Sequence, residues 1–350
     1  MKFSASCLFA VIAGLSAAQW DNNSTAPIEL APAPWTLKGT VYSITLVPLS
    51  DDLPNKAFPP LERQYASATE GEYLGILGMI QIIRYSESPV GPYDELLIVP
   101  GFFKYNHTNA EGEREEKKNV RVSRIYVSQK YTCWNGRTNW NIPKHLARFD
   151  WTEKENGETT VKIYPHDTTG DLSESTPAKK PWFKATFKPD LVNGLPFSTD
   201  LYKILGVNAT LAQPPLPSAS STYGELAGTN HWAATVPGQV TDNASLGVYD
   251  LDQGDGDVEG EGNTNAVGDE YFPNFWPGLL RFNAGIKLEN ATITFRTKVA
   301  FSLQCDLFGV LFCPRNITCR FMRVSLKDYD IGAWKFEPED EKKVIISYMT

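Results

Sequence analysis

The stretch Asn135-Gly136-Arg137-Thr138-Asn139-Trp140-Asn141-Ile142-Pro143-Lys144-His145 carries most of what the sequence predicts about this chain. Residues 121–131 are strand-like and lead into it, and Asn135-Gly136 is typical of a turn. Asn141 stands where a helix N-cap would stand, with Pro143 in the first turn. We therefore expect Lys144 at the start of a short helix. The partial positive charge there predicts a lowered lysine pKa and a neutral amine that can attack a carbonyl; the alternative is a solvated surface lysine.

Two segments resemble the acetoacetate decarboxylase family. Gly136-Arg137, followed at the family's spacing by Pro143-Lys144-x-Leu146, resembles the active-site segment, in which the first motif lysine forms a Schiff base. Gly91-Pro92-Tyr93-Asp94-Glu95 resembles the segment that supplies an active-site glutamate. The resemblance covers residues 35–165 best. It implies that Lys144 is the imine-forming nucleophile, that Glu95 is the catalytic carboxylate, and that the fold is β-rich.

The residues around the two motifs depart from the family pattern. His145 replaces the second lysine, Thr138 stands in place of a glutamate, and Ile80 in place of a further acid, with Gln81 alongside. These changes favour aldol, dehydration or cyclisation chemistry on a larger β-keto or polyketide-like compound over decarboxylation of acetoacetate itself.

Four further residues near the motifs are candidate substrate-binding residues: Arg137, His145, Tyr93 and Trp140. Arg137 is a bidentate partner for a carboxylate or, as the preferred alternative, a member of a structural ion pair. His145 adjusts the charge near Lys144 or lies on a helix surface. Tyr93 and Trp140 suit the wall of an apolar pocket. Glu95 has the alternative of being an ordinary carboxylate at the end of a strand.

Alternating and apolar runs predict a mainly β fold (α+β) with a few short helices, antiparallel and barrel-like. The expected strands are 41–46, 79–85, 95–100, 120–131, 160–164, 182–187, 233–236, 245–249, 292–299, 320–326, 333–336 and 344–348. We expect a single enlarged domain at 35–350, with an acidic, glycine-rich insertion at 250–263 and a polar, solvated leader at 19–34.

The N-terminus and the glycan acceptors predict a secreted glycoprotein. Residues 1–18 resemble a signal peptide, with a basic residue, an apolar run and small residues before Gln19. Asn-x-Ser/Thr acceptors lie at Asn22, Asn23, Asn106, Asn208, Asn243, Asn290 and Asn316. Four cysteines remain after removal of the signal and are disulfide candidates with open pairing: Cys133, Cys305, Cys313 and Cys319.

Charge and motifs exclude several classes of function. The net charge of −8, without a basic run, argues against nucleic acid and anionic membrane surfaces as partners. No membrane span, metal site or cofactor is expected, and a small-molecule substrate or ligand is the expected partner. The acidic run at 255–260 lacks the closing glutamate of a calcium loop. Three hypotheses remain: a Schiff-base lyase, a non-catalytic extracellular small-molecule-binding protein, and a structural cell-wall glycoprotein. The oligomeric state is left open.

Overall fold

A computed structural model describes residues 22–46, 52–54, 56–76, 78–108, 114–169, 173–204, 206–253, 266–267, 270–271 and 281–301. The expected signal peptide, the three C-terminal strands, most of the acidic insertion, Asn316 and the cysteines at 305, 313 and 319 lie outside these residues. Among the described helices, none has the length and apolar character that a membrane span requires.

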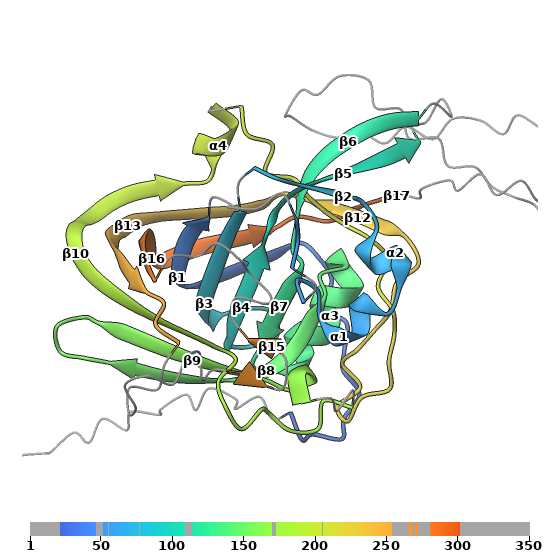
Figure 1. The fold of residues 1–350 in the computed structure, drawn as a ribbon, viewed down its shortest axis with the longest axis horizontal. Helices are drawn as coiled ribbons and strands as arrows, with labels where there is room; N and C mark the ends of the chain where they lie inside the picture. Colours follow the sequence, from blue (N-terminus) through green and yellow to red (C-terminus); the bar gives the residue numbers. More distant parts are fainter. Residues whose placement is uncertain are drawn as a thin grey trace, which may run out of the picture.

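Nine strands form a closed, barrel-like sheet (Figure 1). In spatial order they are β1 (Trp35–Leu46), β16 (Phe282–Phe295), β13 (Pro237–Asp250), β10 (Phe183–Ser198), β9 (Thr159–Pro165), β8 (Lys144–Glu153), β7 (Arg124–Val127), β4 (Tyr93–Val99) and β3 (Gly78–Glu87). The ring closes through antiparallel pairing of β3 with β1. The expectation of a mainly β, largely antiparallel, barrel-like fold is confirmed.

A second sheet has the order β17 (Val299–Phe301), β12 (Trp232–Thr235), β11 (Leu211–Gln213), β6 (Arg114–Arg121), β5 (Gly101–Thr108) and β2 (Glu72–Gly75). Two short strands, β14 (Ala266–Val267) and β15 (Glu270–Tyr271), pair with each other. The helices are short: α1 (Pro60–Arg63), α2 (Ala66–Thr69), α3 (Lys130–Trp140), α4 (Asp200–Ile204) and the 3-10 turn η1 (Asp167–Thr169).

The two faces of the barrel-like sheet carry separate hydrophobic clusters, because successive side chains of a strand point to opposite faces. On β4, for example, Val99 belongs to one cluster, whereas Leu96 and Ile98 belong to the other. The first cluster also contains Cys133 and Trp140 of α3. In Figure 1, α3 lies across β7 and β8.

β7 and β8 are parallel, unlike the other neighbouring pairs in the described ring. A parallel pair needs a crossover connection, and α3 supplies it, so β7, α3 and β8 form a β–α–β unit. This corrects two predictions. The strand expected to continue to Tyr131 ends at Val127, and the turn expected at Asn135-Gly136 lies inside a helix.

The expectation of a helix that begins near Lys144 is also wrong, because Asn141 ends a helix instead of starting one. Its backbone is left-handed, with φ of 55°, and its N–H donates to the Arg137 carbonyl at 3.0 Å. Asparagine is one of the few residues that tolerate this conformation at a helix C-terminus. Lys144 is therefore the first residue of strand β8, and the partial positive charge of a helix start does not act on it.

Candidate functional site

Lys144 and Glu95 meet in the interior, although 49 residues separate them. The Lys144 Nζ atom lies 2.7 Å from Glu95 Oε2, and the two side chains are 5% and 2% exposed. Glu95 comes from β4 and Lys144 from β8, with β7 between them. Removal of one partner of such a buried ion pair strongly destabilises the folded protein, because the other charge is left uncompensated.

Three hydroxyl-bearing residues complete the surroundings of this pair. Thr132 of α3 accepts a hydrogen bond from Lys144 Nζ at 3.0 Å, and Tyr85 donates to Glu95 Oε1 at 3.0 Å. The Tyr93 ring lies 5.2 Å from Lys144 Nζ and 4.4 Å from the Tyr85 ring. Burial, followed by the Glu95 carboxylate, raises the pKa of both tyrosines well above the usual value. Both phenols therefore stay protonated and act as hydrogen-bond donors at neutral pH.

Gly136 leaves room for the lysine side chain. A Cβ atom at this position would lie 2.6 Å from Lys144 Cδ and 2.7 Å from Cε. Real Cβ atoms do not approach other atoms so closely, so a larger residue would displace the lysine. The glycine of the motif is thus explained by the close passage of Lys144 under α3.

The N-terminal segment 22–33 makes hydrogen bonds along α3, although none of its residues is buried. Asn22 Oδ1 accepts the backbone N–H of Lys130 at 2.8 Å, at the start of the helix. Asn135 accepts from the N–H of Ala31 at 2.8 Å and donates to the Glu29 carbonyl at 3.0 Å. These bonds hold in place the helix that supplies Thr132 and Gly136.

A cavity of about 440 Å³ lies between this segment and the first half of α3. It is lined by residues 22–28 and 222–224 together with Lys130 and Trp134, and its lining does not include Lys144 or Glu95. The chemistry suggested by the motifs therefore belongs to the buried ion pair and not to this cavity.

Arg137 is a structural residue that does not face the amine of Lys144. It donates to Glu62 Oε1 at 2.9 Å, to the Ala227 carbonyl at 2.8 Å and to the Pro217 carbonyl at 2.7 Å. It also donates to the backbone carbonyl of Lys144 at 3.2 Å. The guanidinium is fully buried, so its donors join α1, α3 and the 214–231 segment.

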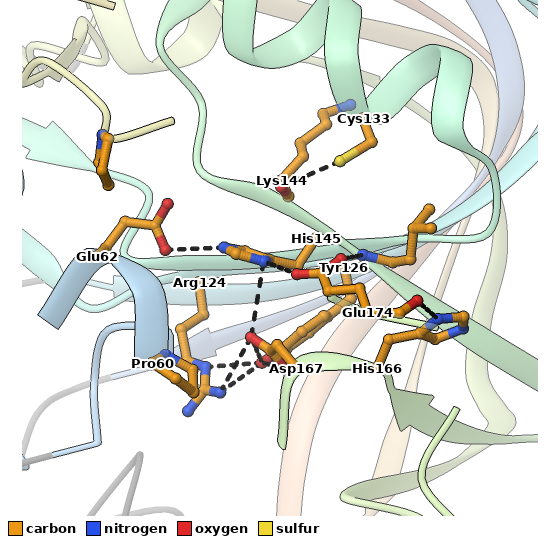
Figure 2. Close-up of polar contacts among 12 residues, drawn as sticks. Pro60, Glu62, Arg124, Tyr126, Cys133, Lys144, His145, His166, Asp167 and Glu174 are labelled. Carbon is orange, nitrogen blue, oxygen red and sulfur yellow. Dashed lines mark hydrogen bonds and ion pairs between the residues drawn. The ribbon is translucent and has the colours of Figure 1, made fainter. Parts of the chain in front are cut away.

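His145 lies on the opposite side of β8 from the Lys144 amine. Figure 2 shows its ring among Glu62, Asp167 and Glu174, with the Lys144 side chain extending the other way. Neighbouring residues of a strand point to opposite faces, so the imidazole and the Lys144 amine lie on different faces of β8. The alternative that His145 lies on a helix surface is wrong, because the residue is fully buried in strand β8.

Trp140 and Cys133 are core residues. The Trp140 ring packs edge-on to Trp35 at 5.2 Å, and its Nε1 donates to the Arg296 carbonyl at 2.7 Å. Cys133 is a free, buried thiol whose Sγ lies 3.1 Å from the Lys144 carbonyl. Among the described residues, Cys133 forms no disulfide. Burial raises the pKa of this thiol well above its usual value, which keeps it protonated.

Sequence reasoning missed Thr132, Tyr85 and Glu62. The pairing of β3 with β4 places Tyr85 opposite Tyr93, and only a predicted register would have revealed it. Thr132 directly follows the strand expected at 120–131, whereas it lies in the first turn of α3. Glu62 lies in a one-turn helix with no motif around it.

Comparisons with known proteins give a partial match in sequence and a broader one in fold. No family model matches the chain. The chain is 28% identical over 123 residues to the protein NEOXANTHIN-DEFICIENT 1 of Oryza sativa subsp. japonica, which is 35% of each protein. It is 28% identical over 120 residues to the protein of the same name from Arabidopsis thaliana, which is 34% of this chain and 37% of the relative. The chain thus matches little more than a third of these curated relatives.

Among solved structures, the chain is similar to acetoacetate decarboxylase from Legionella pneumophila. The identity is 15% and the TM-score 0.43, over 86% of this chain and 98% of the other. It is also similar to the enduracididine biosynthesis enzyme MppR in complex with the condensation product of pyruvate and imidazole 4-carboxaldehyde. That identity is 15% and the TM-score 0.45, over 78% of this chain and 91% of the other.

Proposed function

We propose that this chain carries out lyase-type Schiff-base chemistry with Lys144 on a small β-keto or polyketide-like compound. The observation that carries the proposal is the 2.7 Å contact between Lys144 Nζ and Glu95 Oε2. Two motifs that were singled out separately along the sequence supply the two halves of this contact. An imine-forming site needs an amine together with a group that takes its proton, and the pair supplies both.

The reaction begins when Glu95 accepts a proton from the Lys144 ammonium. The neutral amine adds to the ketone carbon of the substrate, and loss of water gives a protonated imine. In a β-keto acid, the bond to the carboxylate then breaks. Carbon dioxide leaves, and the electron pair moves toward the imine nitrogen to form an enamine. Protonation of the enamine carbon and hydrolysis release the ketone and restore Lys144. An aldol or dehydration reaction would use the same imine.

The surroundings of the amine support this role. Tyr85 and Tyr93 are protonated donors that can hold a carbonyl or carboxylate oxygen of the ligand. Burial strengthens each of these polar contacts, because it removes competing water. Lys144 is 4% exposed, so a ligand reaches the amine only when the residues that cover it move.

The test is reductive trapping with cyanoborohydride in the presence of acetoacetate and larger β-keto acids. Peptide mass spectrometry then locates the adduct. We expect an adduct on Lys144 and none in Lys144→Arg. Lys130 is the matched control, because it is a second buried lysine, 2% exposed, in α3. Lys130→Arg should keep the adduct on Lys144. Absence of an adduct on Lys144 at saturating ligand would overturn the proposal.

A second candidate function is a non-catalytic small-molecule-binding protein. It is favoured by the closed ion pair between Lys144 and Glu95 and by the placement of Arg137 and His145 away from the amine. This candidate predicts that Lys144→Ala binds a β-keto ligand with unchanged affinity and that no adduct forms. A large loss of affinity in that variant would exclude it.

We further propose that the chain is secreted and glycosylated. The acceptors Asn23, Asn106, Asn208 and Asn290 are exposed, as a glycan requires. Expression in a eukaryotic host with and without residues 1–18 tests this. Export and a glycosidase-sensitive mass should both depend on the leader, and an unmodified product retained in the cell would contradict the proposal.

A further inference from the structure

A second buried polar cluster lies on the face of β8 opposite to Lys144. His145 is at its centre, fully buried, with Nε2 2.8 Å from Glu62 Oε2 and Nδ1 in contact with Glu174 Oε1. Asp167 Oδ2 lies 3.9 Å from the same Nδ1 atom (Figure 2). The cluster joins α1, β8, η1 and the segment that begins at residue 173. None of these side chains takes part in the chemistry proposed for Lys144.

Three of these residues have ligand atoms close enough together to hold one metal ion. His145, Asp167 and Glu174 each offer an atom within 4.8 Å of the others, and all three residues are buried. One imidazole with two or three carboxylates is a donor set that suits Zn²⁺ or Mn²⁺.

The contact of His145 with Glu62 matches the outer shell of a metal site. A metal-binding histidine almost always donates its second ring N–H to a carboxylate or a carbonyl, which fixes the ring and leaves the other nitrogen as the ligand. Here Nε2 faces Glu62, and Glu62 is held in turn by Arg137 at 2.9 Å. Nδ1 is thereby directed at Glu174 and Asp167.

Glu225 provides an independent observation. Its side chain is fully buried, and Oε2 accepts a hydrogen bond from Ser221 at 2.7 Å. Its Oε1 has no hydrogen-bond partner among the described residues. The Glu174 carboxylate lies beside it. A buried carboxyl oxygen without a partner, placed against another carboxylate, is an open ligand position.

The charge balance of the cluster favours a divalent cation. Four carboxyl groups, Glu62, Asp167, Glu174 and Glu225, face the two guanidinium groups of Arg124 and Arg137. Two more positive charges are needed for balance. One divalent ion would supply both.

We propose that His145 Nδ1, Asp167 and Glu174, with Glu225 beside them, form a binding site for one divalent transition-metal ion of the Zn²⁺ or Mn²⁺ type. Such an ion would link β8, η1 and two connecting segments through their side chains. Its main effect would therefore be to stabilise the folded chain. The site does not depend on the function proposed for Lys144.

The test uses the full chain, freed of metal with a chelator and then titrated with Zn²⁺ or Mn²⁺ by calorimetry. We expect one ion per chain and a melting temperature that rises with metal concentration, because an ion that binds only the folded state stabilises it. Glu62→Gln should weaken binding roughly 10- to 100-fold, as loss of an outer partner does. Glu174→Gln should weaken it further.

The double variant Lys144→Ala/Glu95→Gln is the matched control for metal binding, because it removes an equally buried carboxylate on the other face of the sheet and leaves no buried charge unpaired. It should keep the wild-type metal affinity. Wild-type protein that binds neither ion, or an affinity that Glu174→Gln leaves unchanged, would overturn the proposal. Glu225→Gln keeps the test decisive if Glu174→Gln does not fold, because loss of the open ligand should still lower the affinity and an unchanged value would count against the site.

Discussion

Replacement of Gly136 by alanine tests whether the glycine exists to make room for Lys144. The added Cβ would lie 2.6 Å from Lys144 Cδ and 2.7 Å from Cε, whereas ordinary contacts begin near 3.4 Å. Overpacking of a buried site costs about 1–3 kcal/mol. Alanine in place of glycine within a helix contributes about 1 kcal/mol in the opposite direction. We therefore expect Gly136→Ala to lower the free energy of unfolding by about 0–2 kcal/mol.

The same substitution should have the opposite effect when the lysine side chain is gone. In a Lys144→Ala/Glu95→Gln background the clash disappears and no buried charge is left unpaired. Gly136→Ala should then stabilise the protein by about 1 kcal/mol, which is its helix contribution alone. The difference between the two backgrounds is the interaction energy of a double-mutant cycle, about 1–3 kcal/mol.

Urea unfolding monitored by tryptophan fluorescence measures all four proteins. Gly136→Ala should also reduce reductive trapping on Lys144, because the displaced amine loses its contact with Glu95. An interaction energy within about 0.5 kcal/mol of zero would refute the steric explanation of the glycine, since sites without contact are additive to that extent.

Two further predictions concern pH and glycosylation. Glu62 has its pKa lowered to about 2, because His145 and Arg137 outweigh the effect of burial, so its stabilising contribution is present above pH 4.5 and is lost as the pH falls toward 2. His145 has its pKa raised to about 10, because Glu62 and Glu174 outweigh burial, so its contribution is present below pH 6.5 and is lost as the pH rises toward 10. The free energy of unfolding, measured with a chelator present, should therefore be greatest between about pH 4.5 and 6.5. In His145→Gln the loss of stability at alkaline pH should become smaller. An unchanged loss at alkaline pH would refute the role given to His145. Glycopeptide mapping should find a glycan on Asn23 and not on Asn22, whose side chain is bonded to Ser128 and Lys130.

The strands were the predictable part of the fold, and α3 was not. Apolar runs such as residues 79–85 and 95–100 were enough to find β3 and β4, whereas the run at 292–299 covers only the end of β16. The helix contains asparagine, glycine and threonine, which are weak helix formers. It is stabilised by the Gln129 side chain, which accepts from Thr132, and by the distant Asn22. Neither the parallel pairing of β7 with β8 nor these long-range caps can be recognised from local sequence.

The candidate site was predictable only where a motif carried it. Lys144 and Glu95 were identified through the resemblance of two segments to the acetoacetate decarboxylase motifs, and the structure brings them together at 2.7 Å. Arg137 and His145 were selected because they lie within the Lys144 segment, Arg137 at a motif position and His145 at the position of the second lysine. Proximity in sequence fails here because the strand alternates its faces and because the donors of Arg137 are taken up by Glu62 and backbone carbonyls. Thr132 and Tyr85 depended on a helix and a register that were not predicted.

The opposite orientation of two adjacent residues separates the chain's two buried polar centres. Lys144 pairs with Glu95, whereas His145 is enclosed by Glu62 and Glu174. These two carboxylates offset the positive charge of the imidazole, so that charge has little electrostatic effect on the Lys144 amine. The electrostatic control of the amine must therefore come from Glu95, Thr132 and the tyrosines. The pH profile of reductive trapping should change in Glu95→Gln and keep its shape in folded His145→Gln. A profile that shifted in both variants would show that the histidine acts through β8, and the separation into two centres would then be wrong.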